Sequence, residues 1–404
     1  GIELDDSQGS DNDWANVIID NAGSDGWTGA AYSAAAVSLQ GSSTLSMDGV
    51  TISNSQAHGI VAHGDVTFSF ANGTFEGNET AAYVHPAVAG SIGAETVFSD
   101  NTNEFVRVAF GNTDSIAGSQ TWQALTAPFR VADRFFVTGD LTLMPGAIVE
   151  WEQDTSMIVE TMGEFSAEGT EADPIVFRGS SAGTRGYWKG IEIKAGGSDM
   201  PLSYGATLDY VEFADAGGQP FSGNGESQAA IYLQETSAAL ITNSTFSNSG
   251  RYGIWAGSNA RLDGFAMNTF TGNARVMYLH PDRVGELTGS STVSGNDDDR
   301  IHVVMGNTDR VTVDATWKDL GVPYEITNRF YTAAALTLEA GVTLEFGQDH
   351  TFIVEEMGSL TANGTMTDPV TFLGVNAVDT GYWGGIRFQT NDPANALTYT
   401  NFAH

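Results

Sequence analysis

Two short segments of the chain are crowded with carboxylate groups. One lies near the start of the sequence and the other follows Asn296; together they contain Asp5, Asp6, Asp11, Asp13, Asp297, Asp298 and Asp299. Oxygen ligands of this kind are those that calcium prefers. Neither segment has the spacing of an EF-hand loop, and neither recurs elsewhere in the chain. Two interpretations stay open: a solvated acidic loop, which most such segments are, and a calcium site. No other cofactor is indicated.

Basic residues are scarce, which bears on whether the chain is a polysaccharide lyase. Such an enzyme needs a basic side chain beside a carboxylate cluster, so that the proton α to a uronate can be removed. The densest group of cations is Arg178, Arg185, Lys189 and Lys194. A second copy of this segment has uncharged residues at the same four positions, namely Leu373, Thr380, Gly384 and Gln389. We therefore interpret the four cations as solvated surface charges.

Paired carboxylates are the signature of a glycosidase, and two glutamates of this chain are candidates. Glu150 and Glu160 recur as Glu345 and Glu355. This repetition argues against a single active site and favours a structural or cation-linking role. The His-Pro pairs that begin at His85 and His280 repeat in the same way, and a packed turn is the more common role of such a pair. The sequence thus predicts no catalytic residue and no enzyme.

Several tryptophans could stack on a sugar or pack in a core. Trp122 recurs as Trp317 and Trp188 as Trp383, whereas Trp151 is replaced by Phe346 in its copy. Exchange with phenylalanine indicates burial in a core. The tryptophans without such copies are better candidates for exposed ligand contacts, although packing is again the alternative: Trp14, Trp27 and Trp255.

A long internal repeat indicates how the structural elements that hold these residues are arranged. Residues 106–191 align with residues 301–386 without a gap, at a constant offset of 195. More than two in five of the aligned positions are identical. The position of this repeat in the chain predicts a first unit over residues 1–189, a second over 190–384 and the start of a third over 385–404, all in one continuous solenoid. We expect the chain to be a window of a longer tandem array.

A shorter period lies inside the long one. Ile52, Phe75 and Phe98 are spaced 23 residues apart, and Phe246, Phe270 and Val293 are spaced 24 and 23 apart. Short strand-like runs and Asn-rich turns lie between these positions, and amphipathic helices are missing. One turn of a parallel β-solenoid needs about this length of chain, and successive coils bury each other's apolar faces. A β-propeller would show a period of about 40 to 50 residues, and a string of β-sandwiches would show no such period. Asn at the turns fits left-handed backbone geometry, with the amide free to bond the next coil.

Charge and composition exclude several functions. The formal net charge is -34, from 16 Lys and Arg against 50 Asp and Glu. A surface this negative repels nucleic acids and anionic membranes. Cysteine is absent, which excludes disulfides and thiolate chemistry. No apolar run approaches the length of a membrane span.

Two stretches resemble a known family. The segment Asn243-Ser-Thr-Phe246-Ser-Asn248, followed by Tyr252-Gly-Ile254, is similar to the repeat of right-handed parallel β-helix proteins. The segment from Gly169 to Ile191, and its copy from Gly364 to Ile386, resembles a motif of large secreted bacterial β-helix proteins of the surface or adhesin type. The resemblance implies an all-β, right-handed parallel β-helix with about 23 residues per coil and a super-repeat of about 195 residues.

Together these features predict an extracellular structural segment of a large bacterial surface protein, such as a fibre shaft, stalk or adhesin. The expected partners are neighbouring β-helix units or further copies stacked end to end, and also cell-surface glycans. The competing hypothesis is a carbohydrate-active enzyme, either a polysaccharide lyase or a glycoside hydrolase. A carbohydrate-binding or ice-binding β-helix is a third. An enzyme should show carboxylates and a cation converging at one place in one unit and not in the other.

Overall fold

A computed structural model describes residues 1–7, 12–24, 26, 34–194, 205–223, 225–234, 236–303, 306, 309–376 and 378–403. Strands make up 48% of the chain and helices 3%, so the protein is all-β. The chain divides into two compact units. Unit 1 comprises Gly1–Gly183 and Gly205–Glu212, and unit 2 comprises Thr184–Tyr204 and Phe213–His404.

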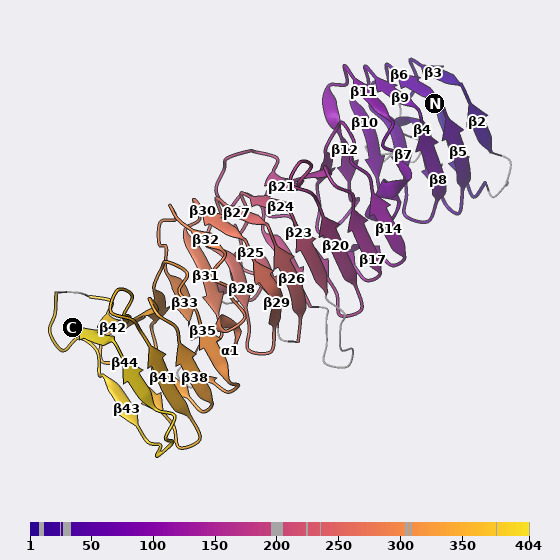
Figure 1. The fold of residues 1–404 in the computed structure, drawn as a ribbon. Coiled ribbons are helices and arrows are strands. Elements are labelled where there is room, and N and C mark those ends of the chain that lie inside the picture. Colours follow the sequence, from indigo (N-terminus) through magenta and orange to yellow (C-terminus); the bar gives the residue numbers. More distant parts are fainter. Residues whose placement is uncertain are drawn as a thin grey trace. The chain divides into compact units, whose positions relative to one another are not determined.

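Unit 1 is a stack of coils whose short strands pair in parallel with the strands of the next coil (Figure 1). Its longest sheet contains β1 (Ile2–Asp5), β4 (Ala35–Gln40), β7 (His58–Ala62), β10 (Thr80–Val84), β12 (Asn103–Val108), β15 (Phe129–Val131), β18 (Ile148–Trp151) and β21 (Ile175–Gly179). Two further sheets contain β3 (Ile18–Asp20), β6 (Thr51–Ser53), β9 (Thr74–Glu76) and β11 (Val97–Ser99), and β13 (Asp114–Ile116), β16 (Phe135–Val137) and β19 (Ser156–Val159). The remaining strands are β2 (Asp13–Ala15), β5 (Thr44–Asp48) and β8 (Thr67–Ala71), and β14 (Ser119–Trp122), β17 (Asp140–Leu143), β20 (Glu164–Glu168) and β23 (Ala206–Asp209).

Unit 2 is built in the same way. Its longest sheet contains β22 (Gly190–Ile193), β25 (Ala229–Leu233), β28 (Tyr252–Ala256), β31 (Arg275–Leu279), β33 (Ile301–Val303), β36 (Tyr324–Ile326), β39 (Thr343–Phe346), β42 (Val370–Gly374) and β45 (Thr400–Ala403). Shorter sheets contain β26 (Ala238–Thr242) and β29 (Arg261–Ala266); β27 (Thr245–Ser247), β30 (Thr269–Thr271) and β32 (Thr292–Val293); β34 (Arg310–Val311), β37 (Phe330–Thr332), β40 (Phe352–Val354) and β43 (Ile386–Phe388); and β35 (Ala315–Trp317), β38 (Ala335–Leu338), β41 (Ser359–Asn363) and β44 (Ala396–Thr398). The division between the units falls inside β24 (Val211–Ala214).

The predicted parallel β-helix is therefore confirmed, and its register follows the predicted period. Ile52 pairs directly with Phe75, and Phe75 pairs with Phe98. In unit 2, Phe246 pairs with Phe270, and their rings stack at 4.9 Å. Flat and branched side chains form such ladders because equivalent positions of successive coils lie directly above one another.

Within the described residues, helices are confined to short turns. Two of them, η2 (Pro86–Ser91) and α1 (Pro281–Val284), occupy equivalent positions in the two copies, and a third is η3 (Gly225–Ser227). The Nδ1 atom of His85 accepts a hydrogen bond from the Ala87 amide at 3.1 Å, and that of His280 accepts one from the Asp282 amide at 3.3 Å. Both histidines thus cap a packed turn, as the repetition of the His-Pro pair indicated.

Asparagine has two roles at the turns, and some residues fulfil both. Asn54 and Asn248 adopt the left-handed conformation, both with φ of 54°, and their side-chain amides donate to Asp20 Oδ1 at 2.8 Å and Asp215 Oδ1 at 2.6 Å on the neighbouring coil. Asn78 does not; the preceding Gly77 has a φ of 65° instead. The fully buried Asn78 side chain donates to the Ile52 carbonyl at 2.9 Å and accepts from the Ser55 amide at 3.0 Å. The expectation that one asparagine both turns the chain and bonds the next coil is therefore wrong for Asn78.

Most of the recurring tryptophan positions pack in the core, as the replacement of Trp151 by Phe346 predicted. Trp122, Trp151, Trp188 and Trp317 are fully buried. Trp383 is half-buried. Trp14 and Trp255, which lack copies, are also half-buried, and Trp27 lies outside the described residues.

His58, on β7, gives unit 1 a pH dependence that can be measured. Burial, aided by the charge of Arg107, lowers the pKa of His58 from its ordinary value of 6.5 to about 4. The unfolded chain therefore takes up a proton at a higher pH than the folded chain does. The resulting stabilisation is complete above pH 6.5 and is lost as the pH falls from 6.5 towards 4. The loss is at most about 3 kcal/mol.

We expect the variant His58→Gln to remove this part of the acid sensitivity. Thermal unfolding of both proteins between pH 7 and pH 4 measures the difference. The melting temperature of the unmodified protein should fall more steeply than that of the variant. Two parallel profiles would contradict the assignment to His58.

Candidate functional site

The outer face of the longest sheet in unit 2 carries one line of aligned side chains, which we call the outward ladder. Its inward neighbours, such as Ile301 and Val303 on β33, are buried in the core, and alternation along a strand directs the ladder residues to the other side. From β22 to β39 the ladder runs through Glu192, Tyr232, Trp255, Tyr278, His302, Glu325 and Glu345. After Glu192 the ladder is aromatic as far as Tyr278, and from His302 onward its residues are ionisable.

The corresponding line in unit 1 carries different residues. From β1 to β21 it runs through Glu3, Ser38, Val61, Tyr83, Arg107, Arg130, Glu150 and Arg178. Tyr83 matches Tyr278 and Glu150 matches Glu345 at the offset of 195. Arg107 and Arg130 are replaced by His302 and Glu325. The two copies therefore share a core but differ on this outer line.

In unit 1 the line is a set of ion pairs. Glu150 accepts from Arg130 Nη2 at 2.5 Å through one carboxylate oxygen and from Arg178 Nη2 at 2.7 Å through the other. Arg107 pairs with Glu152 at 3.0 Å. Because each oxygen of the buried Glu150 binds an arginine of a neighbouring coil, this glutamate links three coils.

In unit 2 the imidazole of His302 lies between two carboxylates. Its Nδ1 atom is 2.8 Å from Oε2 of Glu325, and its Nε2 atom is 3.3 Å from Oδ2 of Asp298. His302 is 5% exposed and Glu325 is 8% exposed, although both belong to the outer line. Each of the three residues offers a ligand atom within 4.8 Å of the others. In the part of the chain that the structure describes, this is the group of His, Asp and Glu side chains close enough to hold one metal ion.

Two further charges border this group. Arg300 lies 2.7 Å from Oε2 of Glu345 and 3.7 Å from Oδ1 of Asp298. Burial alone would raise the pKa of Glu325, but the contact with His302 and the positive charges nearby hold that pKa below its ordinary value. Burial raises the pKa of Glu345, and the charge of Arg300 only partly offsets it. Adjacent coils thus hold one glutamate whose pKa is lowered and one whose pKa is raised.

The acidic residues near position 298 have separate partners. Asp297 is exposed and pairs with Arg185. Asp299 accepts hydrogen bonds from the backbone and side-chain nitrogens of Asn296, at 2.9 and 2.8 Å. Asp298 alone of the three belongs to the group with His302 and Glu325.

The acidic residues near the start of the chain lie on the surface. Asp5 ends β1 and Asp13 begins β2, and both are exposed. Asp6 accepts a hydrogen bond from the Ser42 amide at 3.0 Å. Asp11 lies outside the described residues. Calcium binding at this segment stays a prediction.

The four cations weighed as a lyase site have four different contacts. Arg178 binds Glu150, and Arg185 binds Asp297. Lys189 lies 4.8 Å from the ring centre of Phe221, and Lys194 lies 4.0 Å from Glu192. These contacts agree with surface charges rather than with one catalytic group. The repeated Glu355 also has an ion-pair partner, Arg310 at 2.9 Å.

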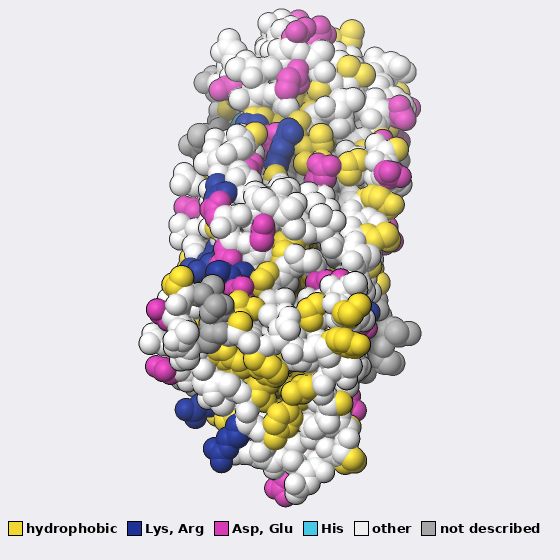
Figure 2. Space-filling model, turned by 60° about the vertical axis from the view of Figure 1, so that its left-hand side comes forward, with side chains coloured by type: hydrophobic (Ala, Val, Ile, Leu, Met, Phe, Trp, Pro, Cys, Tyr) yellow, Lys and Arg dark blue, Asp and Glu magenta, His cyan; other side chains and the backbone are white. Residues whose placement is uncertain are grey.

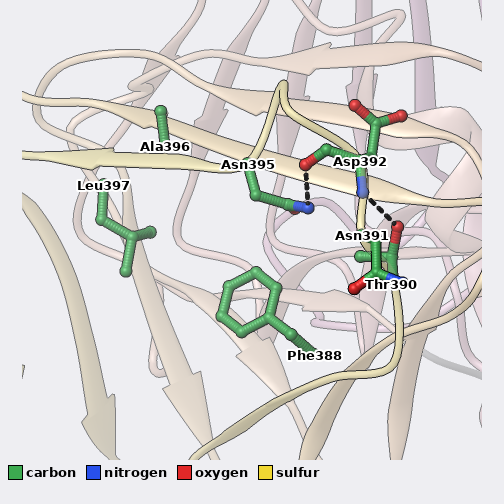
Figure 3. A pocket seen from close by; sticks show the side chains of 7 residues that line it. All are labelled: Phe388, Thr390, Asn391, Asp392, Asn395, Ala396 and Leu397. Atoms are coloured by element: carbon green, nitrogen blue, oxygen red, sulfur yellow. Dashed lines mark hydrogen bonds between the residues drawn. The ribbon is translucent and has the colours of Figure 1, made fainter.

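Among the described residues, two surface depressions are lined by side chains that do not belong to the outward ladder. One, in unit 2, is formed by the turn before β44, where the Asp392 carbonyl accepts from Nδ2 of Asn395 at 2.8 Å and the Asp392 amide donates to Oγ1 of Thr390 at 3.1 Å (Figure 3). The other is a shallow depression in unit 1, lined by Ser115, Phe136, Thr138, Glu160, Thr161 and Met162. Each contains a single carboxylate, so neither has the facing pair that a glycosidase requires.

Sequence reasoning identified Asp298 but missed His302 and Glu325. The signal was present in the internal alignment, where two arginines of the first copy face a histidine and a glutamate in the second. Comparison with protein-family models, with curated proteins and with solved structures found no match. No helix in the described ranges is both long and apolar enough to cross a bilayer.

Proposed function

We propose that the chain is a structural β-helix segment of an extracellular surface protein and that it acts as a spacer rather than as an enzyme. The observation that carries this proposal is the repetition of buried links between coils. Asn273 in unit 2 donates to the Phe246 carbonyl at 2.9 Å and accepts from the Ser249 amide at 2.9 Å. Asn78 makes the same pair of bonds in unit 1. What the two copies share is thus the means of joining coils.

The distribution of charge agrees with this role. Acidic side chains are scattered over the face of the molecule seen in Figure 2, with fewer basic ones among them. A dispersed negative surface keeps neighbouring molecules apart in solution. It suits a secreted bacterial surface protein, which is the location we propose.

Neighbouring β-helix units or further copies of the chain are the partners we propose. The last strands of unit 2 leave Phe388, Leu397 and Phe402 between 42% and 53% exposed. An uncovered strand edge offers unpaired backbone groups and apolar side chains to another strand. Sedimentation velocity at increasing concentration tests this: association is expected, and a constant monomer contradicts it. Cell-surface glycans are a further proposed partner class.

The competing function is carbohydrate cleavage, and one observation favours it. The group around His302 combines carboxylates with Arg300 in unit 2, and the copy in unit 1 lacks it. The deep burial of His302 and Glu325 argues against access by a polymer.

An activity screen separates the two functions. The purified chain is incubated with neutral and uronate-containing polysaccharides, and new reducing ends and unsaturated uronates are measured. We expect no product from any of them. Product formation that is abolished in Glu325→Gln and kept in the control Glu355→Gln would overturn the structural proposal.

A further inference from the structure

The group formed by Asp298, His302 and Glu325 has a feature that an ordinary ion-pair network lacks. The Nε2 atom of His302 is buried and makes no hydrogen bond among the described residues. The nearest carboxylate oxygen, Oδ2 of Asp298, is 3.3 Å away. A charge-assisted hydrogen bond between nitrogen and carboxylate oxygen is usually about 2.7 to 2.9 Å long. A buried nitrogen and a carboxylate oxygen therefore face each other without a hydrogen bond between them.

The other side of the ring faces a second carboxylate. Nδ1 lies 2.8 Å from Oε2 of Glu325, and this buried oxygen makes no hydrogen bond among the described residues either. An imidazole binds a metal ion through a ring nitrogen that carries no proton. A cation between Nε2 and Oδ2 of Asp298 would give the buried Nε2 atom a partner.

The spacing fits a metal ion. Two ligands bound at 2.0 to 2.2 Å with a tetrahedral angle lie about 3.3 to 3.5 Å apart. The separation of Nε2 and Oδ2 is 3.3 Å. A carboxylate that holds the second nitrogen of a metal-binding histidine is a common arrangement, because it fixes the tautomer and the ring orientation. Glu325 is placed for that role, and Oδ1 of Asp298 faces Arg300, which leaves Oδ2 for the ion.

We propose that Asp298 and His302 bind a divalent transition-metal ion of the zinc type, with Glu325 orienting the histidine. A nitrogen ligand favours Zn²⁺ or Co²⁺ over Ca²⁺, which takes oxygen ligands. The proposal therefore replaces calcium by a transition metal at Asp298. It does not depend on the proposed structural function.

The internal repeat supplies variants that are compatible with the fold. The first copy has Asn103 where the second has Asp298, and Arg107 where the second has His302. Both residues lie in β12 of the same solenoid geometry. Asp298→Asn and His302→Arg therefore install residues that an equivalent coil already accepts. Asp297→Asn is the matched control, because Asp297 is an adjacent acidic residue that pairs with Arg185 instead.

The test is calorimetric titration of the full chain, freed of metal with a chelator, with Zn²⁺, Co²⁺ and Ca²⁺ separately. We expect one Zn²⁺ or Co²⁺ site with weaker Ca²⁺ binding, and a Co²⁺ absorption spectrum that shows a nitrogen ligand. Zn²⁺ affinity should fall at least tenfold in Asp298→Asn and His302→Arg and stay unchanged in Asp297→Asn. Glu325→Gln should lower the Zn²⁺ affinity by about 10-fold to 100-fold.

Circular dichroism of each variant establishes that it is folded. Absence of Zn²⁺ and Co²⁺ binding, or binding that both Asp298→Asn and His302→Arg leave unchanged, overturns the proposal. If Asp297→Asn lowers the Zn²⁺ affinity as much as Asp298→Asn and His302→Arg do, the proposal is also overturned, because that result indicates general attraction of the ion to an acidic surface.

Discussion

Replacing Asn78 by leucine is expected to lower the free energy of unfolding of unit 1 by about 3 to 5 kcal/mol. Leucine has nearly the same shape, so the change removes polar atoms and leaves little cavity. The Ser55 amide then loses its partner inside the stack, and the Ile52 carbonyl loses the bond that Asn78 donates. Each buried polar group left without a hydrogen bond costs about 1 to 3 kcal/mol. The link to Asn101, whose Oδ1 accepts from Asn78 at 2.9 Å, is lost as well.

Urea unfolding of the full chain, combined with hydrogen exchange of β6 and β9, measures the Asn78→Leu effect. The control is Asn72→Gly, at an exposed turn where the asparagine has a φ of 50° that glycine adopts without strain. This control is expected to change stability by less than about 1 kcal/mol. Equal effects of the two substitutions would show that the burial of Asn78 is not what stabilises the turn.

Replacing Phe135 by alanine is expected to destabilise unit 1 by about 3 to 5 kcal/mol, the usual cost of emptying an aromatic core position. Phe135 is 1% exposed, and its ring lies 5.8 Å from that of Trp122 and 6.0 Å from that of Trp151. Neither indole is able to move into the space without breaking its own register on a neighbouring coil. The cavity therefore stays largely open.

The next residue on the same strand gives a matched comparison. Phe136 points to the outer face of β16 and is half-buried beside Arg134. We expect Phe136→Ala to lower the free energy of unfolding by less than about 1.5 kcal/mol. The Phe136 ring is already partly exposed in the folded protein, so its removal uncovers less buried apolar surface. Urea unfolding of both variants measures the difference. A larger loss for Phe136 than for Phe135 would mean that the two faces of the strand are wrongly assigned.

The inward side of this fold could be predicted from the sequence because stacking makes it periodic. Ile52, Phe75 and Phe98 recur at a fixed spacing, and the structure pairs them directly. The longer repeat of 195 residues identified Trp122 and Trp317, which are buried. The role of Asn78 was predicted only in part, because the pattern does not say whether Asn78 or Gly77 takes the left-handed conformation.

The outward side was far less predictable. Core packing does not constrain the type of residue there, so His302 and Glu325 follow no period. They meet only because β33 and β36 pair in a register that aligns them, and sequence patterns within one coil do not contain this information. Asp298 was identified through local acidity alone, and that criterion also selected Asp297 and Asp299, which have other partners.

The outward ladder also has a consequence for protein engineering. Successive positions along it are separated by the distance between paired strands, roughly 4.8 Å, and each can change chemistry while the interior stays the same. The arginines of the first copy and the histidine and glutamate of the second are two natural solutions on one backbone template. A protein designer could therefore place charged, aromatic or metal-binding side chains at equivalent outward positions of successive coils, with one substitution per coil and a constant distance between them.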